Sequence, residues 1–249
     1  MIHRSQSIFL MMALVSVAVA GELPLGSSLP SPDYIMKAVG ETEVSLSSSM
    51  GEAGLVVIFS CNTCPWVIAW EDRYVTLAEA FIPKGFGVIA INSNEAYRNR
   101  GDNFDDMTTH AEENGYNFSY ALDEGARLAT EFGASRTPHV FVFNAGGTLV
   151  YRGAIDDNAR QPELVENEYL SDALNAILAG QAIVQNSTKA LGCSIKFAHE
   201  GRSSNDGRCR DRLTQQHQSY SRYSLRTLGT LQVLGVFCPE ASGSFSVVE

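Results

Sequence analysis

The chain has 249 residues, of which 45% are hydrophobic and 18% are charged, and its formal net charge at pH 7 is -10. This length and composition are sufficient for one sizeable hydrophobic core with some chain left over. The acidic balance argues against a protein that binds nucleic acid or an anionic membrane surface.

The first 20 residues have the pattern of a secretory signal peptide. His3 and Arg4 give a basic start, residues 8–20 are almost wholly apolar, and small residues at positions 18 and 20 precede an expected cut before Gly21. The apolar run is too short to span a membrane comfortably. We therefore expect an exported protein without a membrane anchor, in a periplasm, a secretory lumen or the extracellular space, where disulfides persist.

The next segments predict an α/β core. Residues 21–53 are rich in glycine, proline and serine, and only residues 43–46 form a weak strand candidate. Two wholly apolar runs, 55–59 and 86–91, flank a helical stretch. Its apolar residues are three and four positions apart, namely Val67, Trp70, Tyr74, Leu77 and Phe81. This order predicts a βαβ unit whose parallel strands are buried on both faces.

Residues 93–117 are polar and acidic and predict an insertion over or beside the functional site. Within it, Phe104, Met107 and Ala111 have helical spacing, and His110 is expected to be an exposed helix residue. A short strand is expected over 118–122. A helix over 123–132 should follow, with Asp123 as its N-cap and Gly133 as its end.

The last predicted elements are a hairpin and a helix. Strands over 140–143 and 148–151 flank a turn at 144–147, and a helix is expected from Pro162 to Gly180. Asp156 and Asp157 are expected in a solvated turn. Beyond residue 198 the chain becomes rich in arginine, serine and polar amides. We therefore divide the chain into a signal peptide (1–20), a domain (21–197) and a poorly ordered C-terminal extension (198–249).

The most informative motif is Cys61-Asn62-Thr63-Cys64-Pro65, between the first buried strand and the helix. The first N–H groups of a helix lack intrahelical acceptors and carry partial positive charge. A cysteine placed there can have a pKa well below the usual value of about 8.5. A zinc half-site or a structural disulfide is the alternative, but no second Cys or His pair at matching spacing is visible. The context therefore favours a redox pair.

The order of these segments resembles the thioredoxin fold. More narrowly, it resembles the thioredoxin-like, peroxiredoxin-related family grouped with alkyl hydroperoxide reductase and thiol-specific antioxidant proteins. The resemblance covers about residues 25–197 and rests on segments 57–65, 137–143, 151–158 and 190–196. It implies a thioredoxin-like three-layer α/β/α sandwich with a central mixed sheet.

The resemblance also implies roles for Thr137 and Pro138. In thioredoxin-like proteins the proline before the hairpin is cis and faces the cysteine pair. The neighbouring backbone is free to pair with an extended substrate. Thr137 and Pro138 are therefore predicted to bind substrate, whereas His139 is expected only to begin the next strand.

We expect Cys61, as the thiol nearer the helix start and solvent, to attack a substrate disulfide, and Cys64 to resolve the mixed disulfide. The predicted partners are a protein or small-molecule disulfide and a thiol electron donor. No cofactor and no metal are expected. Thioredoxin proper carries a buried acid where this chain has Leu55, so no obvious base serves Cys64.

Two other functions remain open. A peroxiredoxin-like peroxide reductase would use Cys64 as the peroxidatic cysteine, but Val57 and Cys61 stand where peroxiredoxins place Pro and Thr, which favours disulfide exchange. A non-enzymatic copper chaperone would use two thiolates and a histidine. Such proteins usually separate the cysteines by three residues rather than two.

Three further cysteines have no assigned role. Cys193 lies in one of the family segments, and it is either a third redox participant or, as we favour, a small buried apolar residue. Cys209 and Cys238 could form a disulfide in the C-terminal extension, but connectivity does not follow from sequence.

Overall fold

The computed structural model describes residues 21–198. The predicted signal peptide and nearly all of the predicted C-terminal extension, with Cys209 and Cys238, lie outside this range. Among the residues described, no helix is both long and apolar enough to cross a membrane.

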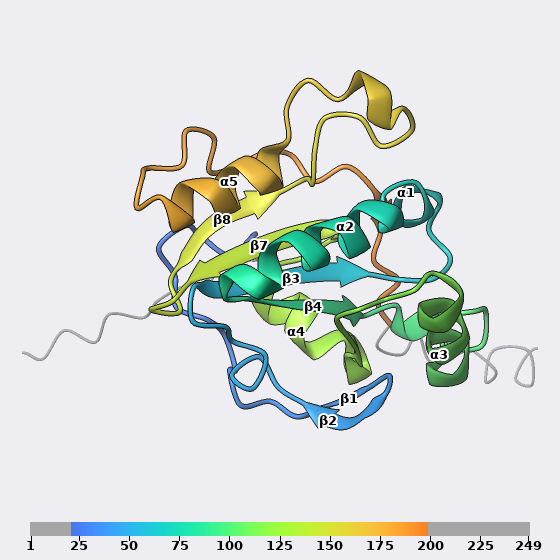
Figure 1. Cartoon of the computed structure of the whole chain (residues 1–249). Coiled ribbons are helices and arrows are strands. Elements are labelled where there is room, and N and C mark those ends of the chain that lie inside the picture. Colours follow the sequence, from blue (N-terminus) through green and yellow to red (C-terminus); the bar gives the residue numbers. More distant parts are fainter. Residues whose placement is uncertain (1–20, 199–249) are drawn as a thin grey trace, which may run out of the picture. The chain divides into compact units, whose positions relative to one another are not determined.

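A seven-stranded mixed sheet with the strand order β2-β1-β5-β4-β3-β7-β8 forms the centre of the described chain (Figure 1). Its strands are β1 (Met36–Ala38), β2 (Glu41–Val44), β3 (Gly54–Ser60), β4 (Phe86–Asn92), β5 (Ser119–Leu122), β7 (His139–Asn144) and β8 (Leu149–Gly153). β3 pairs with β4 in parallel and with β7 antiparallel. The predicted βαβ unit and hairpin are therefore confirmed, and β3 lies at the centre of both.

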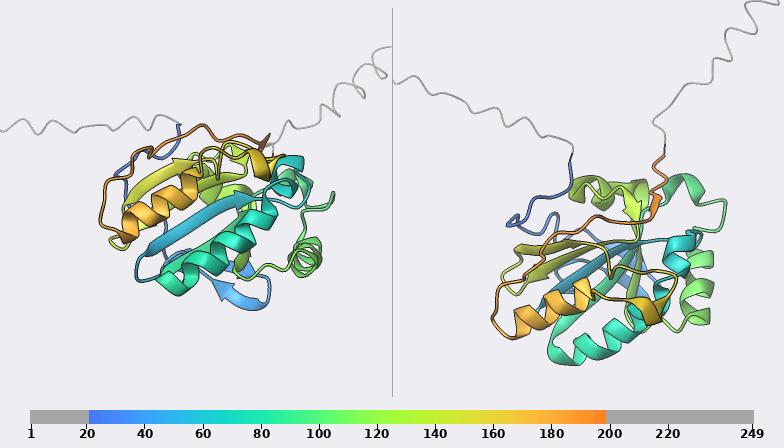
Figure 2. Two further views of the ribbon diagram at one scale, coloured as in Figure 1. Left: turned by 45° about the horizontal axis from the view of Figure 1, so that its top comes forward. Right: turned by 90° about the horizontal axis from the view of Figure 1, so that it is seen from above.

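Helices cover both faces of this sheet (Figures 1 and 2). They are α1 (Pro65–Ile68), α2 (Glu71–Phe81), α3 (Phe104–Glu113), α4 (Arg127–Phe132) and α5 (Tyr169–Leu178). Single 3-10 turns lie at Ile82–Lys84 (η1), Glu95–Tyr97 (η2), Glu124–Ala126 (η3) and Pro162–Leu164 (η4). The predicted three-layer α/β/α sandwich with a central mixed sheet is confirmed.

The alternation of side chains along β3 divides the core into two layers. Val56 and Ile58 pack with α2 and α5, and this layer also contains Cys61 and Cys64. Leu55, Val57 and Phe59 pack with α4 on the opposite face. All five residues of the predicted helical stripe, Val67 to Phe81, are buried. The strand is therefore apolar throughout because both of its faces are covered.

The structure differs from the sequence prediction at several element boundaries. The predicted helix after Cys64 is broken between α1 and α2, where the N–H of Trp70 bonds the carbonyl of Val67 three residues back. Asp123 is not the N-cap of the next helix, which is Ala126, although its carboxylate accepts the N–H groups of Leu128 and Ala129. That helix begins only at Arg127, after Gly125 and Ala126, which both have positive φ.

A second, two-stranded sheet forms beside the main one. β6 (Arg136–Thr137) pairs antiparallel with β9 (Cys193–Ser194). Neither strand is long enough to show the alternation that identifies a strand in a sequence. This small sheet brings residues near the end of the described chain to the loop that precedes β7.

Candidate functional site

The cysteine motif joins the end of β3 to the start of α1. Cys64 is the N-cap of α1 and Pro65 is its first residue, so Cys61 lies three residues before the cap. Both side chains are buried, at 1% exposure for Cys61 and 3% for Cys64. The prediction that Cys61 lies nearer the helix start and solvent is therefore wrong. Both thiols, together with Cys193, are free in this structure.

Thr137 contacts both sulfurs of the motif. Its Oγ1 lies 3.3 Å from Cys61 Sγ, and its carbonyl oxygen accepts the Cys64 S–H at 3.2 Å. The Thr137–Pro138 peptide bond is cis, as the family resemblance implies. Thr137, a predicted site residue from a distant part of the chain, is thus brought against the cysteine pair.

A buried carboxylate, Asp102, holds the cysteine loop from the other side. It accepts the backbone N–H of Asn62 at 2.8 Å and the hydroxyl of Thr63 at 2.9 Å. The side-chain amides of Asn92 and Asn94 also donate to it, each at 3.0 Å. Asp102 is fully buried, and these four donors satisfy both of its oxygens. Asp102 is not recognisable as a site residue from the sequence, because its partners are up to 40 residues away along the chain.

The same segment is tied down on its far side. Arg98 donates to the carbonyls of Asn92, Asp102 and Asp123. The side chain of Asn62 donates to the Gly101 carbonyl at 2.8 Å. The prediction that the polar insertion lies beside the site is confirmed by these contacts. They fix the two residues between the cysteines, so the spacing of the thiols does not depend on the loop alone.

The two thiols of the motif are electrostatically unequal. Hydrogen bonding from the Cys61 thiol lowers the pKa of Cys64 to about 4, with further donors at Cys193 and at the backbone N–H of Val67. The pKa of Cys61 is raised, first by this shared hydrogen bond, then by burial, and also by the nearby Asp102 carboxylate. The Thr137 carbonyl and burial oppose ionisation of Cys64, but the converging donors outweigh them. Cys64 is therefore the thiol of the pair that ionises more readily.

A third sulfur belongs to the same cluster. Cys193 packs against the core layer that contains Cys61 and Cys64, and its thiol and backbone N–H are both placed to hydrogen-bond the Cys64 sulfur. The backbone N–H of Trp66 in turn hydrogen-bonds the Cys193 sulfur. Cys193 is only half-buried. Burial, followed by hydrogen bonding with Cys64, raises the pKa of Cys193 to about 11.

The backbone beside the cis proline is not free, contrary to the sequence prediction. Thr137 pairs directly with Cys193 in the β6–β9 ladder, and Arg136 pairs with Ser194. Gly192 makes this close approach possible, since a Cβ at that position would lie 2.1 Å from the Thr137 carbonyl oxygen. The chain's own strand therefore occupies the edge that the resemblance assigns to a substrate.

Two histidines lie outside this cluster. His139 begins β7 as predicted, and its ring stacks on Phe141 in the opposite core layer, with a centroid distance of 4.4 Å. His110 is not exposed as predicted, because its Nε2 lies 2.7 Å from a carboxylate oxygen of Glu71. Within residues 21–198, no group of three or more His, Cys, Asp or Glu side chains is arranged to hold a metal ion.

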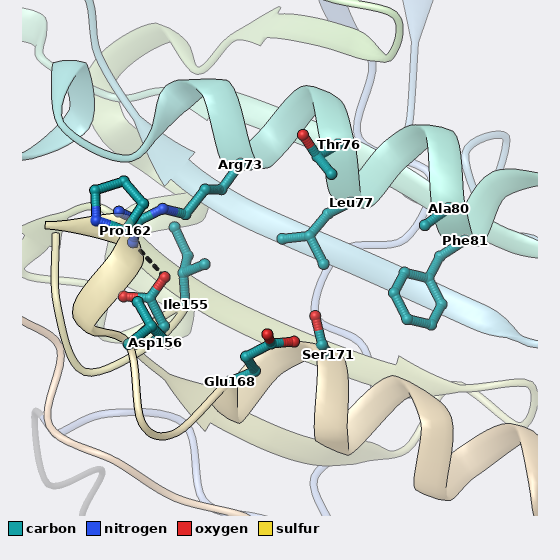
Figure 3. A pocket seen from close by; sticks show the side chains of 11 residues that line it. Arg73, Thr76, Leu77, Ala80, Phe81, Ile155, Asp156, Pro162, Glu168 and Ser171 are labelled. Carbon is teal, nitrogen blue, oxygen red and sulfur yellow. Dashed lines mark hydrogen bonds and ion pairs between the residues drawn. The ribbon is translucent and has the colours of Figure 1, made fainter.

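Asp156 is also not in a solvated turn. It is buried, accepts the indole N–H of Trp70 at 2.8 Å and forms an ion pair with Arg73. This pair borders one end of a pocket of about 270 Å³ between α2 and α5 (Figure 3). Ala80 and Phe81 lie at the other end, and Leu77 lies between the two ends (Figure 3). None of the predicted site residues lines this pocket, so it is distinct from the cysteine site.

Comparisons with known proteins identify one matching family model and several similar structures. The model of the AhpC/TSA family matches residues 29–152. An uncharacterized conserved protein from Geobacillus kaustophilus is 33% identical, with a TM-score of 0.64 over 72% of this chain and 94% of that chain. A hypothetical protein from Sinorhizobium meliloti 1021 is 27% identical, with a TM-score of 0.66 over 72% of this chain and 97% of that chain.

More distant structures are similar in fold alone. A protein from Chlorobium tepidum, described as a candidate thiol:disulfide interchange protein DsbE, is 18% identical. Its TM-score is 0.50 over 63% of this chain and 99% of that chain. No curated protein matches the chain.

Proposed function

Because the chain belongs to the AhpC/TSA family and has a thioredoxin-like fold, we propose that it is a thiol–disulfide oxidoreductase. The redox centre is the Cys61–Cys64 pair, which cycles between two thiols and a disulfide. One observation carries this proposal. The two thiols lie against the same threonine of the cis-proline loop, and their surroundings favour ionisation of Cys64 over ionisation of Cys61.

This asymmetry supports a division of labour that reverses the one expected from sequence. The Cys64 thiolate attacks one sulfur of a substrate disulfide, and the other substrate sulfur leaves as a thiolate. Cys61, after losing its proton to that leaving group, attacks the Cys64 sulfur of the mixed disulfide. The second substrate thiol is released, and the Cys61–Cys64 disulfide remains. The substrate gains the two electrons that the pair loses.

The proposal also includes the cellular location of the protein and its partners. We propose that the protein is exported after removal of residues 1–20 and acts in a periplasm, a secretory lumen or the extracellular space. Its partners are a protein or small-molecule disulfide and a thiol that returns electrons to the pair. Thr137 and Pro138 contribute by positioning the two sulfurs.

Reduction of peroxide by Cys64 is the second candidate function, and the lowered pKa of this cysteine favours it. The surroundings of the thiolate favour disulfide exchange. Cys61 and Val57 replace the Thr and Pro that orient a peroxide in peroxiredoxins, and the side chain of Val57 packs in the opposite core layer.

Three forms of the protein distinguish these functions. Wild type, Cys61→Ser and Cys64→Ser are compared for disulfide reduction and for peroxide consumption. Disulfide exchange requires the Cys64 nucleophile and its Cys61 partner. Cys64→Ser should therefore fall to the background rate, Cys61→Ser should lose most of the wild-type activity, and peroxide turnover should be negligible in all three. The fluorescence of Trp66 and Trp70 should also change when the pair is reduced, since Trp66 follows Cys64 by two residues in the chain.

The opposite pattern would reverse the assignment. Rapid peroxide consumption that persists in Cys61→Ser and disappears in Cys64→Ser identifies a peroxide reductase. If neither activity depends on either cysteine, both candidates are wrong.

A further inference from the structure

The buried position of the cysteine pair leaves a question of access. Cys61 and Cys64 are 1% and 3% exposed, and β9 covers the backbone edge beside the cis proline. A protein disulfide cannot reach either sulfur unless this arrangement changes. Cys193, in β9, is the most accessible of the three clustered sulfurs.

We propose that Cys193 is a third redox thiol, which β9 holds against Cys64. Cys193 exchanges with the Cys61–Cys64 disulfide, and the disulfide then includes a sulfur that is accessible from solvent. This inference rests on the proposed disulfide exchange at Cys61 and Cys64. It assigns to Cys193 the place that a substrate cysteine would take.

The register of the small sheet supports this assignment. Cys193 lies directly opposite Thr137, and the carbonyl of Thr137 contacts the Cys64 sulfur at 3.2 Å. Residues directly opposite in an antiparallel pair have Cα atoms about 4.5–5.5 Å apart. β9 thus lies where an added substrate strand would lie, with a cysteine at the position that faces the reactive thiol.

The path of the chain around β9 maintains this contact. Gly192 allows the backbone to lie against Thr137 and Pro138 without a clash. On the other side, Asn94 accepts the N–H of Lys196 at 2.9 Å, and Ala96 donates to the Lys196 carbonyl at 2.8 Å. The segment that carries Asp102 therefore holds β9 as well as the cysteine loop.

The proposed step is an exchange of bonds without net oxidation. Cys193 loses its proton and attacks the Cys64 sulfur, the Cys61–Cys64 bond breaks, and a Cys64–Cys193 bond forms. Cys61 leaves as a thiolate and takes up a proton. An external dithiol then attacks the Cys193 sulfur and displaces Cys64, which is the better leaving group because its thiolate is stabilised. The second thiol of the partner displaces Cys193. The partner becomes a disulfide, and the protein gains its two electrons.

Disulfide mapping of the full-length protein tests this proposal. Wild type and Cys61→Ser are oxidised with diamide, the remaining thiols are blocked, and linked peptides are identified by mass spectrometry. We expect a Cys64–Cys193 link in both, as a minor species beside Cys61–Cys64 in wild type and as the main species in Cys61→Ser. Cys64→Ser should give no Cys61–Cys193 link, because the cysteine that interacts with the Cys193 thiol in this structure is Cys64.

A second pair of variants tests the role of β9. In the Cys61→Ser background, Gly192→Ala should reduce the Cys64–Cys193 link by about tenfold or more, since overlap with backbone atoms costs at least the 1.4 kcal/mol that a factor of ten represents. Ser194→Ala is the matched control, because Ser194 is exposed and should leave the link unchanged. Circular dichroism confirms that both variants fold.

The possible failures are distinguishable. If Cys61→Ser leaves Cys193 free, or links Cys64 to Cys209, Cys238 or a second molecule instead, the role of Cys193 is wrong. The proposed function survives that result as long as wild type forms a reversible Cys61–Cys64 disulfide. If wild type forms no such disulfide, the proposed function itself fails.

Discussion

The sulfur of Cys64 accepts hydrogen bonds from both backbone and side-chain donors of the site. It receives hydrogen bonds from the thiols of Cys61 and Cys193 and from the backbone N–H groups of Val67 and Cys193. Donors that converge on a charged acceptor stabilise the charge, and here they overcome the burial of the group. Cys61 has the opposite environment, because the Asp102 carboxylate opposes a second negative charge.

Titration of the reduced protein tests this assignment. The ultraviolet absorbance of one thiolate should appear near pH 4, far below the ordinary cysteine pKa of about 8.5. Cys61→Ala should raise this midpoint, whereas Cys61→Ser should largely preserve it because a hydroxyl also donates a hydrogen bond. Cys64→Ser should abolish the transition. Appearance of the first thiolate only near pH 9 in wild type would show that the donors do not act as described.

The same shift has a consequence for stability. The pKa of Cys64 is lower in the folded protein than in the unfolded chain, so the unfolded chain binds more protons between about pH 4 and 9. Cys64 therefore contributes stability that is fully present above pH 9 and is lost as the pH falls through about 4.

At the scale of elements, the sequence predicted best what depends on local periodicity. The two apolar runs correctly predicted β3 and β4, and the apolar residues from Val67 to Phe81 correctly predicted the buried face of α1 and α2. The three-residue β1 and the two-residue β9 were missed, because such short strands have no period to detect. Asp102 and Asp156 were also missed as buried groups, since a polar side chain is buried by partners that only the fold brings to it.

Asp156 shows how one such group joins several elements. It links Trp70, just before α2, and Arg73, within α2, to the segment after β8. Asp156→Ala should lower the free energy of unfolding by about 3 kcal/mol, because removing one partner leaves a largely buried guanidinium without its counter-ion. Denaturant unfolding measures this loss.

The neighbouring residue provides a matched control. Asp157 bonds exposed groups at Glu166 and Asn167, so Asp157→Ala should have a much smaller effect. Replacing both partners with apolar residues, as in Arg73→Met with Asp156→Leu, should recover part of the stability lost in Asp156→Ala. Equal losses in the two aspartate variants would contradict the structural role of Asp156.

At the scale of the whole molecule, the N-terminal end of the described chain is bonded to the hairpin and to α4. Leu23 donates its N–H to the carbonyl of Phe132 at 2.9 Å, and Arg152 donates to the carbonyls of Glu22 and Leu23. The backbone of Gly21 lies so close to Gly133 that a Cβ there would be 2.2 Å from the Gly21 carbonyl oxygen. Residues from Gly21 onward are thus part of the folded domain.

Because of these contacts, the predicted signal peptide can be cleaved before Gly21 without loss of structure, whereas cleavage further into the chain would remove contacts of the domain. We predict that the protein is exported and that the exported form begins at Gly21, and the intact mass of material recovered from a secreting host tests both. Ala20→Arg should block the cut, and Val19→Leu should not, since only the small residues on either side of position 19 are required. Exported protein that retains residues 1–20 would contradict the signal-peptide assignment.

The pairing of β9 with β6 also bears on which partners the protein serves. A peptide that approaches the cis-proline edge competes with a strand of the same chain, whose tether gives it an effective concentration of at least about 1 mM. Weakly binding unfolded chains lose this competition. The protein should therefore be a poor general reductant of misfolded polypeptides and should serve a dedicated partner, one that binds tightly enough to displace two residues of strand.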